Sequence, residues 1–556
     1  MPSSNIPIIS NMLATIRLLV NDKLRRKDRF DTVVLSTLTW FLLYFAYKLW
    51  KHLQRYGLHQ GFEVPLKRYA LKQVRRIPQV RAKIDAELDK ATEGLDEMVL
   101  KDVEHRNSAL PQQGKPSSEL LPYMEKCAEK EHKNWENGGQ SGCVYHGGEE
   151  LYEMQGKVLG MFALSNLLHA DVFTKTRQME AEVIAMTLDL FNGKSEEGAC
   201  GSVTSGGTES ILLAMKAYRD WGRAERGITE PNIVIPHSAH AAFIKAGQYF
   251  GIDVRVARLT EDVMDVNLNH VESLINKNTV AIVGSCPQFP QGVVDNIEGL
   301  ARIALKHKTN LHVDCCLGGY LLPFMEENGF SMPTRFDFRV PGVTSISCDT
   351  HKYGFSPKGT SVLMFRSPDL RKYQYSTCSE WPGGIYGTPT ICGSRPAAAV
   401  AATWATLMHI GRDGYKQSCK TIVSAAKQLE KGIDSIDGVR VLGRPSVSVV
   451  AITCTNGVNG YDLAEWLKEN TKTHWNLNML QMPSGIHICV TRLNAGKIDE
   501  LLKDIEAGVE AEKAKLDSGV KSGHSGNAAV YGSAASVPKE LADVVVAKYL
   551  DTCYKA

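Results

Sequence analysis

One lysine in this chain stands where a buried amine could act as a nucleophile. Lys352 follows a short apolar run, Ser345–Ser347, that predicts a strand, and a second predicted strand comes after it at Thr360–Phe365. Gly354 and Gly359 predict tight turns that hold the lysine near the end of the first strand. Burial lowers the pKa of an amine, and lysines activated in this way form Schiff bases. The competing interpretation is an ordinary surface lysine beside a turn.

A glycine-rich turn lies upstream, between a predicted strand at Ala199–Thr204 and a predicted helix at Glu209–Trp221. Gly206 and Gly207 would let the backbone approach an anion, which the free N–H groups and the dipole of the helix would attract. Thr208 could instead be a plain N-cap that needs no ligand. The turn is neither a Walker loop nor a GxGxxG fingerprint, so it does not imply a nucleotide.

Two further polar side chains follow predicted strands. His240 could lie flat over a cofactor ring, although a lone histidine is more often a helix cap or a core residue. Asp314 ends an apolar strand, where a carboxylate needs a cationic partner such as a protonated pyridine nitrogen. A zinc site of His312, Asp314, Cys315 and Cys316 is the rival, but successive strand residues point to opposite faces.

Taken together, these features fit one cofactor. A phosphate loop, a ring-facing histidine, a carboxylate for the ring nitrogen and a Schiff-base lysine are the parts of a pyridoxal phosphate site. In a mostly parallel sheet such residues meet outside the carboxyl ends of the strands. The combination therefore predicts pyridoxal phosphate and is far more specific than any of its members.

At this point the sequence resembles a known family, the sphingosine-1-phosphate lyases, which are pyridoxal phosphate enzymes of the group II decarboxylase-like set. The resemblance covers nearly the whole chain. The motifs that carry it are SVTSGGTES, SAHAAF, PQFPQGVVD, HVDCCLGGY, FDFRVPGVTSISCDTHKYG, GGIYGTPT and GSRP. It implies the α/β fold of type I pyridoxal phosphate enzymes, like aspartate aminotransferase: a mostly parallel sheet, a smaller C-terminal α+β domain and an N-terminal transmembrane helix.

The same resemblance implies where and how the protein works. It implies a homodimer with shared active sites and a single span in the endoplasmic reticulum membrane, with the catalytic region facing the cytosol. The implied activity belongs to sphingolipid breakdown and cleaves phosphorylated long-chain bases between C2 and C3. The products would be a long-chain fatty aldehyde and phosphoethanolamine.

Roles for individual residues also come from the resemblance. Lys352 would form the Schiff base, Asp314 would face the pyridinium nitrogen, and His240 would stack on the ring. Tyr386 would lie close to the reacting carbons. The remaining residues that it implies bind a phosphate: Gly206, Gly207, Thr208, His351 and, from a second subunit, Gly393 and Ser394 for the cofactor, and Tyr145, His169 and Lys358 for the substrate.

The chemistry itself leaves some alternatives open. Cleavage beside a 3-hydroxyl needs a base, and the candidates are Tyr386, Tyr145, the freed Lys352 and a phosphate oxygen. The same electron sink would serve an amino-acid decarboxylase, which is the alternative enzyme. A membrane scaffold on an inactive fold is a third hypothesis. An anchor near the bilayer favours a lipid substrate.

The membrane segment is predicted at Thr32–Trp50. It is apolar apart from hydroxyl groups and Lys48, and its aromatic residues suit an interfacial belt. Basic residues flank both ends almost equally, so the charges alone do not determine the orientation. The alternative is a buried helix of a soluble domain. Ile8–Val20 could form a short amphipathic helix on the membrane surface.

Composition and pattern predict the organisation. With 556 residues the chain is too long for one core, and its net charge of +3 gives no sign of nucleic-acid binding. The 13 cysteines form no CxxC pairs, which indicates a reducing compartment. We expect an anchor segment at 1–60, a helical linker region at 61–190, a large cofactor domain at 191–395 and a small domain with its tail at 396–556. The tail should hold a loop at 518–536 and a helix at Lys539–Tyr549.

Within the large domain, strands should alternate with helices. The predicted strands not yet named are Ile233–Pro236, Val254–Leu259, Val280–Ser285 and Leu311–Val313, and the predicted helices are Ala239–Phe250, Val271–Asn276 and Asn296–His307. The small domain should hold helices at Pro396–Met408, Gly414–Ile433 and Tyr461–Asn470 and strands at Val439–Ile452 and His487–Thr491.

Overall fold

The structure of the chain is a computed structural model. It describes residues 29–58, 77–79, 81–82, 85–86, 89, 95–101, 103, 107–518 and 539–555. The chain divides into two units, one made of 1–110 with 538–556 and the other of 111–537. The predicted amphipathic helix at 8–20 and nearly all of the predicted loop at 518–536 lie outside the described residues.

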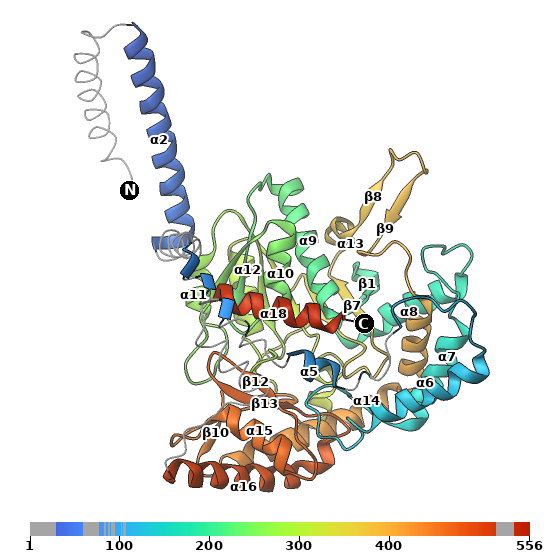
Figure 1. Ribbon diagram of the computed structural model, residues 1–556. Coiled ribbons are helices and arrows are strands. Elements are labelled where there is room, and N and C mark those ends of the chain that lie inside the picture. The colour runs from blue at the N-terminus through green and yellow to red at the C-terminus, as the bar shows by residue number, and fades with distance from the viewer. Residues whose placement is uncertain are drawn as a thin grey trace. The chain divides into compact units, whose positions relative to one another are not determined.

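A seven-stranded sheet forms the centre of the 111–537 unit (Figure 1). Its order is β1-β7-β6-β5-β4-β2-β3, and only β7 runs antiparallel to its neighbours. The strands are β1 Cys200–Thr204, β2 Asn232–Pro236, β3 Asp253–Ala257, β4 Thr279–Ser285, β5 Asn310–Asp314, β6 Ser345–Cys348 and β7 Ser361–Phe365. Most of their residues are buried, which explains why the strands read as continuous apolar runs. The prediction of a mostly parallel sheet is confirmed.

Helices connect the parallel strands. They are α9 Gly207–Arg226, α10 Ala242–Phe250, α11 Leu268–Leu274 and α12 Ile297–Lys306. Asn267 and Asn296 begin α11 and α12 by accepting hydrogen bonds from backbone N–H groups of the first turn. The helix predicted from Ala239 begins at Ala242, because the residues just before it form a turn.

A second, antiparallel sheet forms the small domain. Its order is β10-β11-β13-β12. Its strands are β10 Val439–Val441, β11 Val449–Cys454, β12 Asn478–Leu480 and β13 Gly485–Cys489, and its helices are α15 Gly460–Asn470 and α16 Ile498–Asp517. The two helices predicted before this sheet are the arms of one long helix, α14 Ala397–Ile433, which bends at Gly411, where φ is 62°. Neither α16 nor β12 was predicted.

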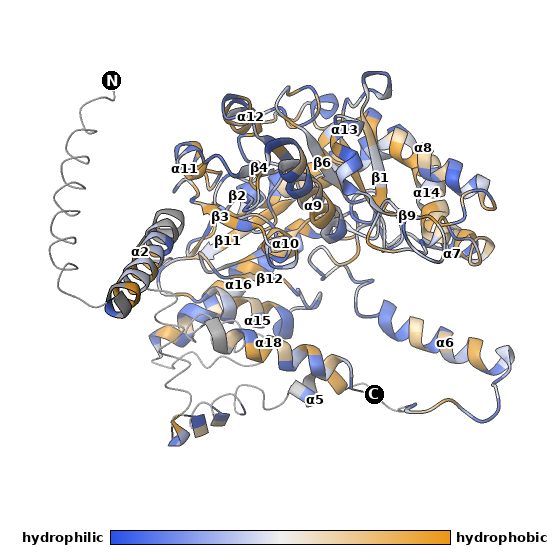
Figure 2. Cartoon of the chain, turned by 90° about the horizontal axis from the view of Figure 1, so that it is seen from above, coloured by the Kyte–Doolittle hydropathy of each residue, from blue (hydrophilic) through white to orange (hydrophobic). Residues whose placement is uncertain are grey.

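Within the 111–537 unit, three α-helices precede the large sheet: α6 Ser117–His132, α7 Glu149–Met161 and α8 Thr174–Leu190. α7 and α8 pack against α14. Hydrophilic and hydrophobic residues alternate along α6 in Figure 2, and no residue of α6 is buried. A hairpin of β8 Ser376–Cys378 and β9 Tyr386–Thr388 projects from this unit (Figure 1).

The other unit holds the predicted membrane segment. α2 spans Arg29–Leu58, and within it Val33–Trp50 has a mean hydropathy of 1.4, with no residue buried. By length and composition this helix could cross a membrane, and its exposure does not fit the alternative of a buried helix. The predicted C-terminal helix is α18 Lys539–Cys553. It lies in this unit with α5 Leu95–Leu100, rather than with the small domain. The predicted boundaries at 60, 190 and 395 remain predictions.

Candidate active site

Lys352 lies in the loop between β6 and β7, and its amine forms an ion pair. Its Nζ is 2.9 Å from Oδ2 of Asp349, a carboxylate that is only 2% exposed. Burial opposes the charge on Lys352, but Asp349, Cys316 and Tyr145 together raise the pKa of this lysine above its ordinary value. The expectation of a lowered pKa is therefore wrong, because the sequence reasoning considered burial and missed Asp349, three residues before the lysine.

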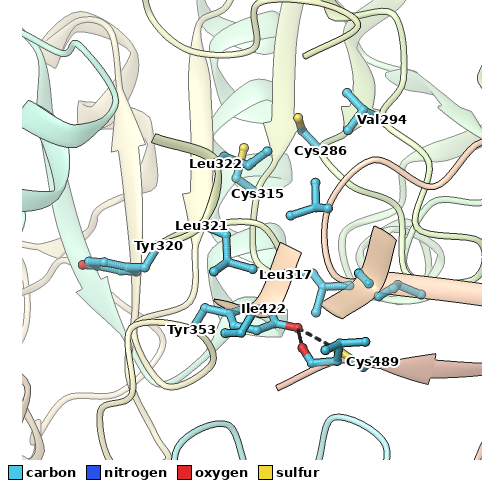
Figure 3. Close-up of a cluster of buried hydrophobic side chains, with 14 of the residues drawn as sticks. Cys286, Val294, Cys315, Leu317, Tyr320, Leu321, Leu322, Tyr353, Ile422 and Cys489 are labelled. Carbon is cyan, nitrogen blue, oxygen red and sulfur yellow. Dashed lines mark hydrogen bonds between the residues drawn. The ribbon is translucent and has the colours of Figure 1, made fainter. Parts of the chain in front are cut away.

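The next residue anchors the loop in the core. The Tyr353 hydroxyl donates to the Val490 carbonyl over 2.6 Å and lies 3.1 Å from the Cys489 sulfur (Figure 3). The side chain of Tyr353 is 1% exposed. Because Tyr353 cannot move without leaving this core, the backbone of Lys352 is held at a fixed place.

The glycine-rich turn opens α9 as predicted. The helix begins at Gly207, and Gly206, which has no side chain, takes the N-cap position rather than Thr208. A Cβ on Gly207 would lie 2.8 Å from both carboxylate oxygens of Asp349, and one on Gly206 would lie 3.3 Å from Cε1 of His351. The turn, His351 and Asp349 therefore meet, and only glycines fit at the turn.

Asp314 lies at the end of β5 and is 7% exposed. Its Oδ1 accepts hydrogen bonds from the Cys316 N–H at 3.0 Å and from the Ser347 hydroxyl at 3.2 Å. Burial acts to raise the pKa of Asp314, but His240, His312 and Cys316 oppose burial and bring the pKa below its ordinary value. Asp314 is thus a carboxylate at neutral pH, as a partner for a ring nitrogen must be.

His240 is exposed just before α10, and its Nδ1 accepts a hydrogen bond from the Ala242 N–H at 3.1 Å. His240 therefore satisfies the first backbone N–H of α10, while Ala241 takes the N-cap position. The charge of His240 acts to lower the pKa of Asp314.

A cavity of about 280 Å³ brings together Lys352, His351, Lys358 and Tyr145. The Lys358 ammonium lies 4.9 Å from the centre of the Tyr145 ring. Partial burial lowers the pKa of Lys358. Burial, with Cys489 as the next cause, raises the pKa of Tyr145, so its phenol keeps its proton.

The remaining predicted residues form a separate group. The Asn166 side chain donates to the Ser394 hydroxyl over 3.1 Å, and the backbone carbonyl of Asn166 accepts from the backbone N–H of His169, whose side chain is exposed. Gly393 lies against the Tyr386 hydroxyl, which would be 2.5 Å from a Cβ at that position. None of these four predicted residues lines the cavity of Lys352.

Comparison with known proteins agrees with this geometry. The family model described as the pyridoxal-dependent decarboxylase conserved domain matches residues 101–453. The sphingosine-1-phosphate lyase of Saccharomyces cerevisiae is 42% identical, over 86% of this chain and 81% of the relative. That of Drosophila melanogaster is 42% identical, over 85% of each. The chain belongs to the sphingosine-1-phosphate lyase family.

Solved structures agree with this membership. The sphingosine-1-phosphate lyase structure from Burkholderia pseudomallei matches with a TM-score of 0.72 and 38% identity, over 76% of this chain and 96% of that one. A Lactobacillus brevis glutamate decarboxylase matches with a TM-score of 0.63 at 20% identity, over 74% and 96%, so it supports the fold alone. The predicted fold and the resemblance stated above are confirmed.

The family is pyridoxal phosphate-dependent, and the residues present fit that cofactor. The turn before α9 has no room for a Cβ at Gly207, Asp314 is ionised, and Lys352 projects into the adjoining cavity. The zinc alternative finds no support, because His312 is hydrogen-bonded to Ser345 and Ser347. Over the described ranges, no group of three His, Cys, Asp or Glu side chains could hold a metal ion.

Proposed function

We propose that this chain is a sphingosine-1-phosphate lyase, which cleaves phosphorylated long-chain bases between C2 and C3 into a long-chain fatty aldehyde and phosphoethanolamine. One observation carries the proposal beyond family membership. The cavity that holds Lys352 also holds a second ammonium group, that of Lys358, beside the Tyr145 ring. An amino-acid decarboxylase has no need of a second phosphate-binding cation there, whereas a phosphorylated base does.

Pyridoxal phosphate, when bound, supplies the electron sink that stabilises the charge left on C2 by cleavage. Lys352 would hold the cofactor covalently, and Asp314 would keep its ring nitrogen protonated. His240 would cover the ring. Its phosphate would be held by Gly206, Gly207, Thr208 and His351, completed by Gly393 and Ser394 of a second copy.

The substrate phosphate binds at Lys358 and Tyr145. A dianion would favour the charged form of Lys358, opposing the partial burial that lowers its pKa, and the protonated Tyr145 phenol would donate to a phosphate oxygen. Because Tyr145 keeps its proton, it acts as a donor rather than as the base for the 3-hydroxyl. Tyr386, the freed Lys352 and a phosphate oxygen remain the candidates for that base.

His169 reaches the substrate phosphate from a second copy of the chain. It shares Asn166 with Ser394, outside the cavity of Lys352, so a homodimer would let both residues serve the partner's site. Large exposed apolar residues support a dimer. They lie on α6, around α7 and α8, and on the β8–β9 hairpin: Leu121, Tyr123, Met124, Met161, Leu164, Val172, Trp381 and Ile385.

The anchor is α2, and we place it in the endoplasmic reticulum membrane with the catalytic unit on the cytosolic side. Its apolar stretch, Val33–Trp50, carries Trp40, Tyr44, Tyr47 and Trp50, which suit an interfacial belt. An active site fixed near the bilayer shortens the path of a poorly soluble substrate.

The test is to incubate the full-length protein, loaded with pyridoxal phosphate, with a phosphorylated long-chain base, glutamate or an aromatic amino acid. Formation of fatty aldehyde and phosphoethanolamine from the lipid, without carbon dioxide from the amino acids, is the expected result. Release of carbon dioxide alone would establish the alternative, an amino-acid decarboxylase.

A further inference from the structure

A buried chain of hydrogen bonds runs behind Asp314, from β5 through β6 to α9. His312, on β5 and fully buried, has its Nε2 3.2 Å from the Ser347 hydroxyl and its Nδ1 2.7 Å from the Ser345 hydroxyl. Ser347 donates to Asp314, and Tyr218 of α9 is hydrogen-bonded to Ser345. Four side chains thus connect the helix that carries the phosphate loop to the carboxylate at the end of β5.

The ionised state of Asp314 sets the direction of every bond in this chain. A carboxylate only accepts, so the Ser347 hydroxyl must donate to it and must in turn accept from His312 Nε2–H. Burial lowers the pKa of His312 to about 4, so at neutral pH its ring has a single N–H. Its Nδ1 therefore accepts from Ser345, which accepts from Tyr218.

The other tautomer of His312 would remove a hydrogen bond from Asp314. If the single proton of His312 lay on Nδ1, Nε2 would accept from Ser347 and draw that hydroxyl away from Asp314. Asp314 Oδ1 would then lose the Ser347 hydroxyl and keep the Cys316 N–H. A buried carboxylate that loses a donor becomes easier to protonate. A protonated Asp314 could not pair with a cationic ring nitrogen.

We propose that His312 is a positioning residue: through Ser347 it keeps Asp314 ionised and oriented toward the protonated ring nitrogen of pyridoxal phosphate. This inference rests on the role of Asp314 in the proposed function. His312 touches neither cofactor nor substrate in this arrangement. A residue that only filled space could be apolar here, since the Phe243 ring packs against the imidazole in a T-shaped contact, with centroids 5.8 Å apart. A buried polar ring is kept at a cost, and its hydrogen bonds must offset that cost.

The experiment compares two ligands on the full-length protein freed of its cofactor. One is pyridoxal phosphate, and the other is its deaza analogue, in which carbon replaces the ring nitrogen. Both carry the aldehyde and the phosphate, so they share every contact except the one to Asp314. Equilibrium affinities are measured for the wild type, His312→Leu and His312→Gln, since glutamine can still donate to Ser347 and accept from Ser345.

We expect His312→Leu to weaken pyridoxal phosphate binding by about 10-fold or more and to leave the deaza analogue unchanged, the scale of one hydrogen bond to a charged group. His312→Gln should restore most of the affinity. If His312→Leu does not fold, Ser347→Ala removes only the last hydroxyl and should show the same ligand dependence. The control is Thr187→Val, because Thr187 is a buried hydroxyl hydrogen-bonded to Tyr320, away from this chain.

Equal weakening of both ligands, or no weakening of either, would overturn the proposal, because His312 would then be structural. The affinities do not involve the lipid. Failure to form fatty aldehyde, with the expected affinities, would instead overturn the proposed function and leave the role of His312 standing.

Discussion

The ammonium group of Lys352, which is partly buried, and the buried carboxylate of Asp349 form an ion pair, with Nζ 2.9 Å from Oδ2. The carboxylate therefore stabilises the protonated, charged form of the lysine. Both oxygens of Asp349 also lie against Gly207 of the glycine-rich turn, so the carboxylate borders both the lysine and the turn that we propose for the cofactor phosphate.

Asp349→Asn should lower the pKa of Lys352, because burial would then act without its main opposing charge. The measurement is the rate at which cofactor-free protein forms a borohydride-trapped adduct with pyridoxal, followed against pH. The profile should move to lower pH. Asp220→Asn is the matched control, since Asp220 pairs with Lys216 at 3.2 Å on α9. A pH profile identical to that of the wild type would show that Asp349 does not control the amine.

Lys352→Ala should abolish turnover, because no amine remains to hold the cofactor. It should also leave Asp349 buried without its lysine, at a cost of about 3 kcal/mol in the free energy of unfolding. The double variant Lys352→Ala with Asp349→Asn should recover most of this loss while staying inactive. Denaturant unfolding of the single and double variants measures the effect. Normal turnover in Lys352→Ala would remove the basis of the cofactor assignment.

Lys358→Ala should weaken use of a phosphorylated long-chain base by about 1.5–3 kcal/mol, the scale of a charge-assisted hydrogen bond. The absorbance of bound pyridoxal phosphate should not change. Binding of the same base without its phosphate, measured on wild type and variant, is the control and should be equal. If both bases lose affinity alike, Lys358 acts in folding or cofactor binding instead of substrate recognition.

His487 should make the protein less stable in acid. It is fully buried on β13, with Nδ1 2.9 Å from the Pro290 carbonyl, and burial lowers its pKa to about 4. The unfolded chain binds a proton near pH 6.5 and the folded chain does not. Stability is thus complete above about pH 6.5 and falls as the pH drops toward about 4, by up to ~3 kcal/mol from this residue.

His487→Gln should flatten the dependence of the unfolding free energy on pH in that window by about one proton. His237→Gln, at an exposed position just after β2, is the control and should leave the slope alone. An unchanged slope in His487→Gln would mean that the buried ring is not what makes the protein sensitive to acid.

Deletion of residues 1–60 should give a soluble protein that still binds pyridoxal phosphate, because the deleted part contains α2 and none of the site residues named above. Size-exclusion chromatography and the absorbance of the bound cofactor check this. A truncated chain that aggregates without cofactor under several conditions would place the boundary of the catalytic region earlier.

The sequence by itself determined the parts of this protein that depend on neighbours along the chain. Apolar runs and their periodicity located the seven strands of the large sheet to within two residues at each end, because burial on both faces demands such runs. The motifs around Gly207, Asp314 and Lys352 predicted the cofactor, because each follows a strand whose end must lie at the same edge of the sheet.

Only the tertiary structure decided what depends on residues that meet across the fold. The direction of the pKa shift of Lys352 depends on its distance to Asp349, because burial lowers the pKa of a lysine whereas a nearby carboxylate raises it. The bonds from His312 to Ser345 and Ser347 exist because β5 and β6 pair in one register, and a shift by one residue would turn these side chains away. Likewise, the Asn166 side chain meets the Ser394 hydroxyl although more than two hundred positions separate them in the chain. Local pattern sets which elements form, whereas register and distance set the electrostatics of the site.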